Sequence, residues 1–242
     1  MTALSRNRPL IGPLELTGRS RRHVVDSAGA LLQPAAARAF ARMQVAAGKA
    51  GLDLCAASSY RDFATQVRIW NQKWRGERPL LDRQGRPLLA HELSPRARVR
   101  AILIWSAAPG ASRHHWGTEV DVYDRAALPA GQSLRLVPAE YAAGGPFAAL
   151  TAWLDGNMER FGFYRPYATD RGGVQPEAWH LSHAPTAREA SRRLRPQTVV
   201  RALQSSAIEG KAALLANFEA IYARYVRAVD PPPRAVGRGA RG

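Results

Sequence analysis

Two short segments contain four of the six histidines of this 242-residue chain, and both place them beside carboxylates. The first contains His114 and Asp121, and the second contains Glu177 and His180. A hydrolytic zinc site needs three nitrogen or oxygen ligands, one coordination position left open, and a nearby base. His114, Asp121 and His180 could supply such ligands, and Glu177 could act as the base.

The remaining histidines and the single cysteine limit the alternatives. His115 and His183 each lie next to a proposed ligand, so either could take its place in a metal site. His23 and His91 stand alone, and a solitary histidine is usually structural or exposed. Cys55 is the one cysteine, which excludes an intramolecular disulfide framework and any zinc site that needs several thiolates. Its apolar neighbours predict a small buried side chain and not a nucleophile.

The two histidine segments resemble the paired motifs S-x-H-x-x-G-x-A-x-D and E-x-x-W-H of the D-alanyl-D-alanine carboxypeptidase and dipeptidase family. The superfamily of these enzymes also includes the hedgehog signalling domain. The matching positions are Ser112, His114, Gly117, Asp121, Glu177, Trp179 and His180. The resemblance implies a zinc ion held by the two histidines and the aspartate, with Glu177 as general base.

A third stretch, Ser59-Tyr60-Arg61 followed by Gln66, resembles the S-G-Y-R segment of the same family. The arginine of that segment is implicated in binding or polarising the substrate. The resemblance therefore implies a substrate or transition-state role for Arg61, and it makes Tyr60 and Gln66 candidate substrate-binding residues. A surface cation is the alternative for Arg61. The likeness covers roughly residues 52–183.

Ser112 and Trp179 are the remaining candidates for substrate contact. Ser112 could be a turn residue or a hydrogen-bond donor to substrate, and Trp179 could fill the core or shape a subsite beside the metal. Glu119 departs from the motif, because it stands where the family usually has alanine. Side chains alternate along a strand, so Glu119 should share a face with Asp121. There it could orient a ligand, pair with an arginine or alter substrate preference.

Hydrophobic periodicity predicts an alternation of helices and short strands. Helices are expected over 33–49, 62–74, 96–107, 146–160, 186–195, 198–205 and 211–229, and strands over 52–59, 118–123, 161–164 and 177–182. Residues 76–92 read as a surface excursion. The resemblance implies an α+β fold in which a small antiparallel sheet carries the zinc ligands, is flanked by helices and is followed by a C-terminal helical extension.

The expected organisation has four parts. They are an irregular N-terminal segment over 1–30, a zinc peptidase domain over 31–195, a helical extension over 196–230 and a disordered Arg/Gly-rich tail over 231–242. The last helix carries an apolar stripe. We expect this stripe to pack on its own domain, and a partner-binding helix is the alternative.

The chain carries 35 basic and 19 acidic residues, for a net charge of +16. Such a field favours polyanions, so an anionic cell envelope is a possible partner. The basic residues show no zinc-finger or RNP-type signature, and no specific nucleic acid is expected. No run of apolar residues is long enough for a transmembrane helix, and the first residues lack an apolar signal region.

The resemblance predicts a zinc D,D-carboxypeptidase that acts on peptidoglycan stem peptides. An L,D-peptidase, an endolysin-type cell-wall hydrolase and a noncatalytic zinc-bearing module are the alternatives. The noncatalytic reading is disfavoured by Glu177, since a scaffold need not keep a base three residues before its ligand. The chemistry indicates the periplasm or cell envelope, whereas the missing signal region leaves a cytoplasmic role open.

Overall fold

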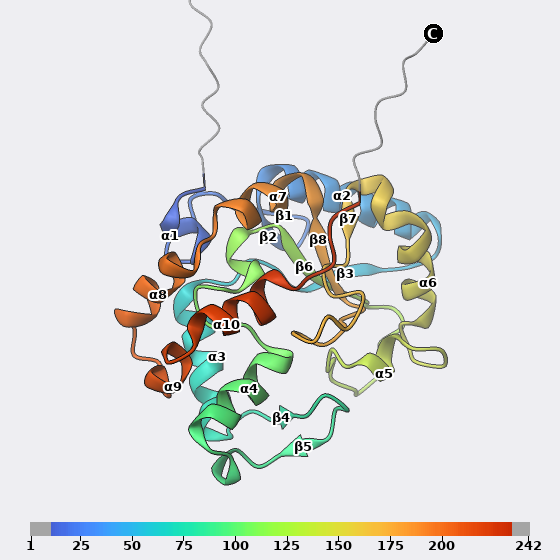
Figure 1. Ribbon diagram of the computed structural model, residues 1–242. Helices are drawn as coiled ribbons and strands as arrows, with labels where there is room; N and C mark the ends of the chain where they lie inside the picture. The colour runs from blue at the N-terminus through green and yellow to red at the C-terminus, as the bar shows by residue number, and fades with distance from the viewer. Residues whose placement is uncertain (1–10, 234–242) are drawn as a thin grey trace, which may run out of the picture.

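A four-stranded antiparallel sheet lies at the centre of the computed structural model, which describes residues 11–233 (Figure 1). Its strand order is β3-β6-β8-β7. The strands are β3 (Leu54–Ser58), β6 (Glu119–Asp124), β8 (His180–His183) and β7 (Phe163–Tyr164). Helices surround this small sheet, so the predicted α+β fold is confirmed.

The two central strands have one apolar and one polar face. Val120, Val122 and Leu181 are fully buried in a hydrophobic core on one side of the sheet. Because side chains alternate along a strand, the residues between them point to the other side. Those residues are Glu119 and Asp121 on β6 and His180 and Ser182 on β8. The alternation therefore separates structural residues from the polar residues of the site.

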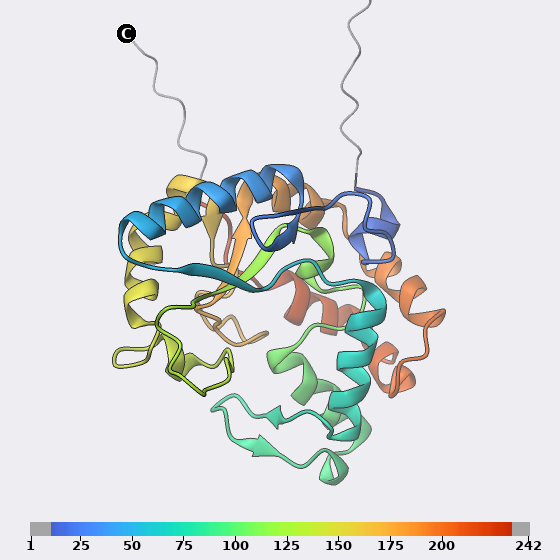
Figure 2. The ribbon, with the colours of Figure 1, turned by 180° about the vertical axis from the view of Figure 1, so that it is seen from behind.

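The apolar face packs against α2 (Pro34–Lys49) and α6 (Ala148–Asn157). Figures 1 and 2 show the strands lying between these two helices and the pair α3 and α4. Phe40 and Leu150 are fully buried in this core, and a buried side chain of this kind contributes about 1.5–3 kcal/mol. The short elements α5 (Pro138–Tyr141) and η3 (Met158–Phe161) adjoin α6.

A second core lies around α3 (Phe63–Arg75) and α4 (Pro95–Trp105), where Trp70 and Ile102 are fully buried. The start of each helix follows from its cap. The Asp62 side chain accepts a hydrogen bond from the Thr65 N–H at 2.7 Å, and Ser94 caps α4 in the same way. Two further helices, α7 (Ala184–Arg193) and α8 (Pro196–Gln204), add side chains to this core.

One expectation about local structure was wrong, and another was incomplete. The N-terminal segment, expected to be irregular, contains helix α1 (Pro13–Leu16) and a hairpin of β1 (Val25–Ser27) and β2 (Ala30–Leu32). The excursion over 76–92 also contains a hairpin. It consists of β4 (Leu80–Leu81) and β5 (Pro87–Leu88) and leads into the 3-10 turn η1 (Ala90–Glu92). Residues 1–10 lie outside the described part of the chain.

The predicted long C-terminal helix is in fact three short pieces. These are α9 (Lys211–Leu215), α10 (Phe218–Tyr222) and the π-helical turn η4 (Ala223–Arg227). The break lies at Asn217, whose φ of −142° is not helical. Phe218 and Tyr222 are buried in the second core, so the stripe packs on its own chain as expected. The predicted disordered tail lies outside the described residues from 234 onward.

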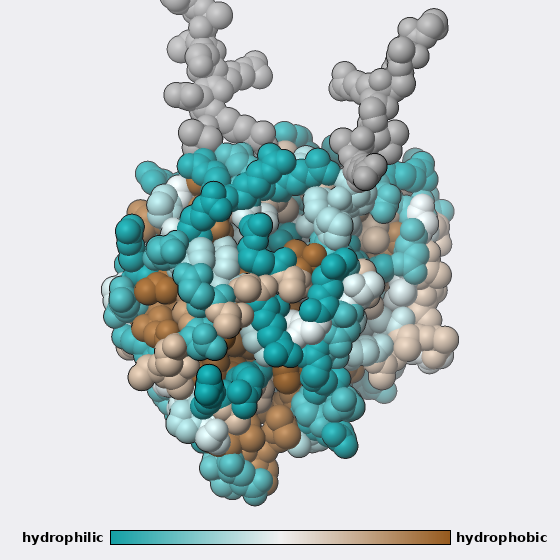
Figure 3. All heavy atoms as spheres, viewed as in Figure 1, coloured by the Kyte–Doolittle hydropathy of each residue, from teal (hydrophilic) through white to brown (hydrophobic). Residues whose placement is uncertain are grey.

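On the face seen in Figure 3, apolar residues lie in small separate groups among hydrophilic ones. Within residues 11–233, no helix combines the length and apolar character needed to span a bilayer.

Candidate active site

His114, Asp121 and His180 form a buried cluster of potential metal ligands. One donor atom from each lies within 4.8 Å of the other two. Asp121 Oδ2 is 3.3 Å from His114 Nε2, and Asp121 Oδ1 is 2.9 Å from His180 Nδ1. Asp121 and His180 are direct partners in the β6–β8 register, so strand pairing brings them together. The structure thus places the three predicted ligands side by side.

His114 reaches the cluster from the 3-10 turn η2 (Arg113–Trp116), which ends at Gly117. Gly117 has a φ of +64°, and a Cβ there would lie 2.3 Å from Val24 Cγ1, so only glycine fits. The Nδ1–H of His114 donates to the Ser59 carbonyl at 2.7 Å. This hydrogen bond leaves Nε2 directed at Asp121.

The donor set suits zinc. Two imidazole nitrogens and one carboxylate form the three-ligand set of catalytic zinc sites, with a position left for water or substrate. Burial opposes ionisation of Asp121, but the two neighbouring histidines outweigh it and hold the pKa of this carboxyl well below its usual value. The carboxylate is therefore ionised and ready to bind a cation.

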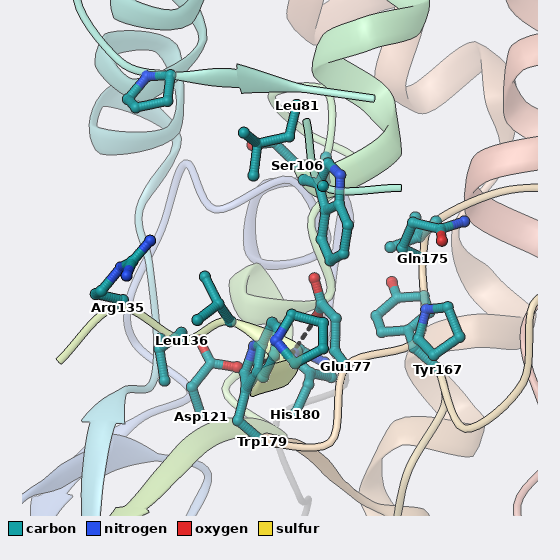
Figure 4. A pocket seen from close by; sticks show the side chains of 18 of the residues that line it. Leu81, Ser106, Asp121, Arg135, Leu136, Tyr167, Gln175, Glu177, Trp179 and His180 are labelled. Carbon is teal, nitrogen blue, oxygen red and sulfur yellow. Dashed lines mark hydrogen bonds and ion pairs between the residues drawn. The ribbon is translucent and has the colours of Figure 1, made fainter. Parts of the chain in front are cut away.

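Glu177 lies in the loop before β8, with Oε2 3.7 Å from His180 Nδ1. Figure 4 shows its carboxylate beside His180 in the pocket. Burial raises the pKa of Glu177 to about 7, although the charge of His180 works in the opposite direction. A carboxylate with a pKa near neutrality is suited to accept a proton and return it.

Arg61 lines the same pocket, and two neighbouring side chains hold its guanidinium in place. Its guanidinium donates to Gln66 Oε1 at 2.9 Å and to Ser58 Oγ at 3.1 Å. Gln66 is fully buried, does not line the pocket, and donates to the Ala107 carbonyl at 2.8 Å. Gln66 therefore lies behind Arg61, where it supports the guanidinium, and not at the pocket surface where a substrate contact was predicted.

Tyr60 also differs from the prediction. Its hydroxyl donates to the Ser20 carbonyl at 3.2 Å, its ring packs edge-on against His23, and it does not line the pocket. Strand β3 ends at Ser58, shortly before Tyr60, and the side chains of Tyr60 and Arg61 point in different directions. Tyr60 therefore holds the N-terminal segment and lies away from the pocket lining, where a substrate contact was predicted. Ser112 and Trp179 do line the pocket, as a substrate role requires.

The neighbouring histidines lie outside the metal cluster. His115 is buried, with Nδ1–H donating to the Arg61 carbonyl at 2.6 Å and Nε2 accepting from the Gly110 N–H at 3.0 Å. His183 lies on the opposite face of β8 from His180, beside Phe163 and the Thr186 hydroxyl. His115 therefore positions the backbone of Arg61, and strand alternation directs His183 away from the site.

The pocket has a volume of about 1260 Å³ and contains several residues that the sequence did not single out. Tyr167 packs its ring against His180 at 5.1 Å. Lys73, Arg78 and Arg135 add positive charge to the lining, and burial lowers the pKa of Lys73 to about 8. Lys73 lies two helical turns after Gln66, so helical spacing alone could have placed it near Arg61.

The segment that carries Tyr167 and Glu177 is tied down by the C-terminal region. Asp230 donates its N–H to the Pro166 carbonyl at 2.8 Å, and its carboxylate accepts from both the N–H and the hydroxyl of Thr169 at 2.8 Å. Arg171 Nε donates to the same carboxylate at 2.7 Å. The C-terminal region therefore supports one wall of the pocket.

Comparison with known proteins identifies the family. The model of the family described as VanY, D-alanyl-D-alanine carboxypeptidase, matches residues 29–186. The chain belongs to this family. Two uncharacterized proteins of Haemophilus influenzae are similar to this chain. The first is 41% identical over 118 residues, which cover 48% of this chain and 90% of the relative. The second is 43% identical over 100 residues, which cover 39% of this chain and 68% of the relative.

Solved structures include similar chains. VanYB in complex with D-alanine-D-alanine has a TM-score of 0.48 and 21% identity, and the match covers 76% of this chain and 88% of that one. The LdcB LD-carboxypeptidase has a TM-score of 0.48 and 18% identity, with coverage of 80% and 77%. Family membership makes the chain a peptidase of the VanY type.

Proposed function

We propose that this VanY-family chain is a zinc-dependent D,D-carboxypeptidase that removes the terminal D-alanine from peptidoglycan stem peptides. One observation carries the proposal: a single pocket contains the three-donor cluster, the Glu177 carboxylate and the Arg61 guanidinium. These are the ligand set, the base and the oxyanion-binding cation that metal-assisted peptide hydrolysis requires.

Each residue of this site can be assigned a role in the hydrolysis of a peptide bond. Zinc held by His114, Asp121 and His180 would supply Lewis acidity and an acidified water as nucleophile. Glu177 takes the proton of the attacking water and returns it to the leaving amine. Arg61 donates to the oxygen on which negative charge develops, an interaction typically worth about 3–4 kcal/mol in the transition state.

The charge of the pocket supports a substrate with a free carboxylate. Arg61, Lys73, Arg78 and Arg135 all line it. Among residues 11–233, Lys73 has no hydrogen bond or ion pair to another side chain, so its ammonium can bind a ligand. A carboxypeptidase substrate brings a carboxylate next to the scissile bond, whereas an internal peptide bond does not. The basic lining therefore favours cleavage at a chain end.

The test uses purified stem peptides and mass spectrometry. Zinc-loaded protein is incubated with a pentapeptide ending in D-Ala-D-Ala and, separately, with the tetrapeptide that lacks the last residue. Loss of one alanine from the pentapeptide alone is expected, and the Glu177→Gln variant should leave it intact. Cleavage of the tetrapeptide alone would replace the proposal by an L,D-carboxypeptidase, and cleavage of cross-linked dimers alone by an endolysin-type activity. No cleavage by zinc-bound protein would favour a noncatalytic module.

The proposed substrate also defines a proposed location. Stem peptides occur in the bacterial periplasm and cell envelope, and the net charge of +16 would attract the protein to anionic envelope polymers. Fractionation of cells that produce the protein tests this proposal, because recovery in the cytoplasm alone would contradict it.

A further inference from the structure

Glu119 is a fully buried carboxylate directly behind one of the proposed metal ligands. Its Oε2 lies 3.0 Å from His180 Nε2, while His180 Nδ1 lies 2.9 Å from Asp121 Oδ1. The two ring nitrogens of His180 therefore face two different carboxylates. Only Asp121 lines the pocket, so Glu119 cannot contact substrate.

We propose that Glu119 is a positioning residue of the metal site, which fixes the ring orientation and tautomer of His180. This inference rests on the zinc site of the proposed function. A neutral imidazole that donates its Nε2–H to a carboxylate keeps the Nδ1 lone pair for a metal ion. Such a carboxylate partner also makes the imidazole a stronger ligand.

A dense set of donors holds the Glu119 carboxylate in place. Its Oε1 accepts from Thr118 Oγ1 and Ser182 Oγ, both at 2.8 Å, and from Arg113 Nη2 at 3.2 Å. Arg113 also donates to Tyr164 and lies over the ring of Trp116. Three donors thus converge on one oxygen, and the other oxygen is left for His180 alone.

The β6–β8 register explains why this arrangement belongs to the metal site. Asp121 pairs with His180, and Glu119 pairs with Ser182 on the same face. Glu119 and Asp121 therefore reach the His180 ring from neighbouring positions on one face of β6. The other histidine ligand, His114, has a neutral partner in the Ser59 carbonyl. Each histidine thus has one nitrogen held by the protein and one left for the cluster.

Burying Glu119 and Arg113 together carries a desolvation penalty that an apolar pair of similar size would avoid. The related motif has alanine at position 119, so the sheet itself does not require a carboxylate there. Glu119 is connected to the proposed metal ligands by its contact with the His180 ring. A role in holding His180 therefore accounts for this costly pair.

The test compares zinc affinity in the Glu119→Ala and Glu119→Gln variants, measured by competition with a chromophoric chelator. Loss of such a carboxylate partner typically weakens metal binding about 10- to 100-fold. Glutamine should do no better than alanine. Its amide oxygen would replace Oε1, where the three donors converge, so its NH₂ would face His180 Nε2 and favour the tautomer with a proton on Nδ1.

A matched control is Ser182→Ala, which removes one hydrogen bond to Glu119 Oε1 but leaves the contact with His180. Its zinc affinity should stay within about threefold of wild type. Nitrogen-detected NMR of zinc-loaded wild-type protein should show His180 protonated at Nε2 and ligated through Nδ1. If Glu119→Ala alone does not fold, the double variant Glu119→Ala/Arg113→Met removes both buried charges and is measured instead.

The outcomes separate this inference from the proposed function. Wild-type zinc binding with both Glu119 variants within threefold of it would overturn the role of Glu119 and leave the proposed peptidase intact. An Nε2-ligated His180 in the wild type would overturn the tautomer assignment in the same way. A wild-type protein that binds no zinc would overturn the proposed function itself.

Discussion

Replacing Glu177 by glutamine should lower activity and raise stability at once. Burial raises the pKa of this carboxyl from a usual value of 4.5 to about 7 in the metal-free protein. The folded state therefore favours the protonated form, and stability falls as pH rises from the unfolded pKa through the folded one. At 1.36 kcal/mol per pKa unit, the ionised Glu177 costs on the order of 3 kcal/mol above pH 7.

Glutamine cannot ionise, so the metal-free Glu177→Gln variant should be more stable than wild type at pH 8 by about that amount. The difference should shrink as pH falls through 7 and disappear below about 4.5. Hydrolysis by the zinc-loaded variant should fall about 10²- to 10⁴-fold, the usual contribution of a general base. Zinc content should not change, because Glu177 is not one of the three ligands.

Urea denaturation of chelator-treated proteins at pH 8 and pH 4 measures the stability effect, and product release from a stem pentapeptide measures the activity. Glu189→Gln is the control, because Glu189 is an exposed carboxylate on α7 that pairs with Arg193. Its variant should match wild type in activity and differ little in stability at either pH. A Glu177→Gln protein with near-wild-type hydrolysis and no added stability at pH 8 would refute the reasoning.

Three further changes test other parts of the site. Hydrogen bonds to Asp121 and Glu119 outweigh the effect of burial and raise the pKa of His180 to about 10 in the metal-free protein, so zinc must displace a proton. Affinity should therefore increase from pH 6 to pH 9, and calorimetry in buffers of different ionisation enthalpy should detect proton release. Arg61→Ala should keep zinc but lose about 10²- to 10³-fold in kcat, and unchanged kinetics would contradict a transition-state role for Arg61. Asp230→Ala removes the hydrogen-bond partner of Thr169 and Arg171. It should speed amide hydrogen exchange over 165–177 and lower the free energy of unfolding by about 1–3 kcal/mol. Unchanged exchange would show that these hydrogen bonds are not needed to hold the segment.

The sequence by itself singled out the three residues that the structure brings together as potential metal ligands, and it singled out Glu177 as the proposed base. The motif spacing separated His114 and His180 from His115 and His183, and the structure brings the chosen pair together with Asp121. The resemblance to the family motifs implied this choice. Strand alternation agrees with it for Asp121 and His180, because it is a local property that assigns each residue of β6 and β8 to one face. The starts of α3 and α4 were also predictable from the local sequence, since a cap acts within one turn, whereas the break at Asn217 was not.

Contacts between distant segments were decided by the tertiary structure alone. Tyr60 adjoins Arg61 and Gln66 follows it by five residues, yet neither lines the pocket. Their positions depend on contacts with the N-terminal segment and with the Ala107 carbonyl after α4. The sequence could place Glu119 on the face of Asp121 but could not choose among its partners. His180 is 61 residues away in the chain, and Arg113 approaches from a different turn. The support of the pocket wall by Asp230 likewise depends on contacts with Pro166, Thr169 and Arg171, which no local pattern encodes.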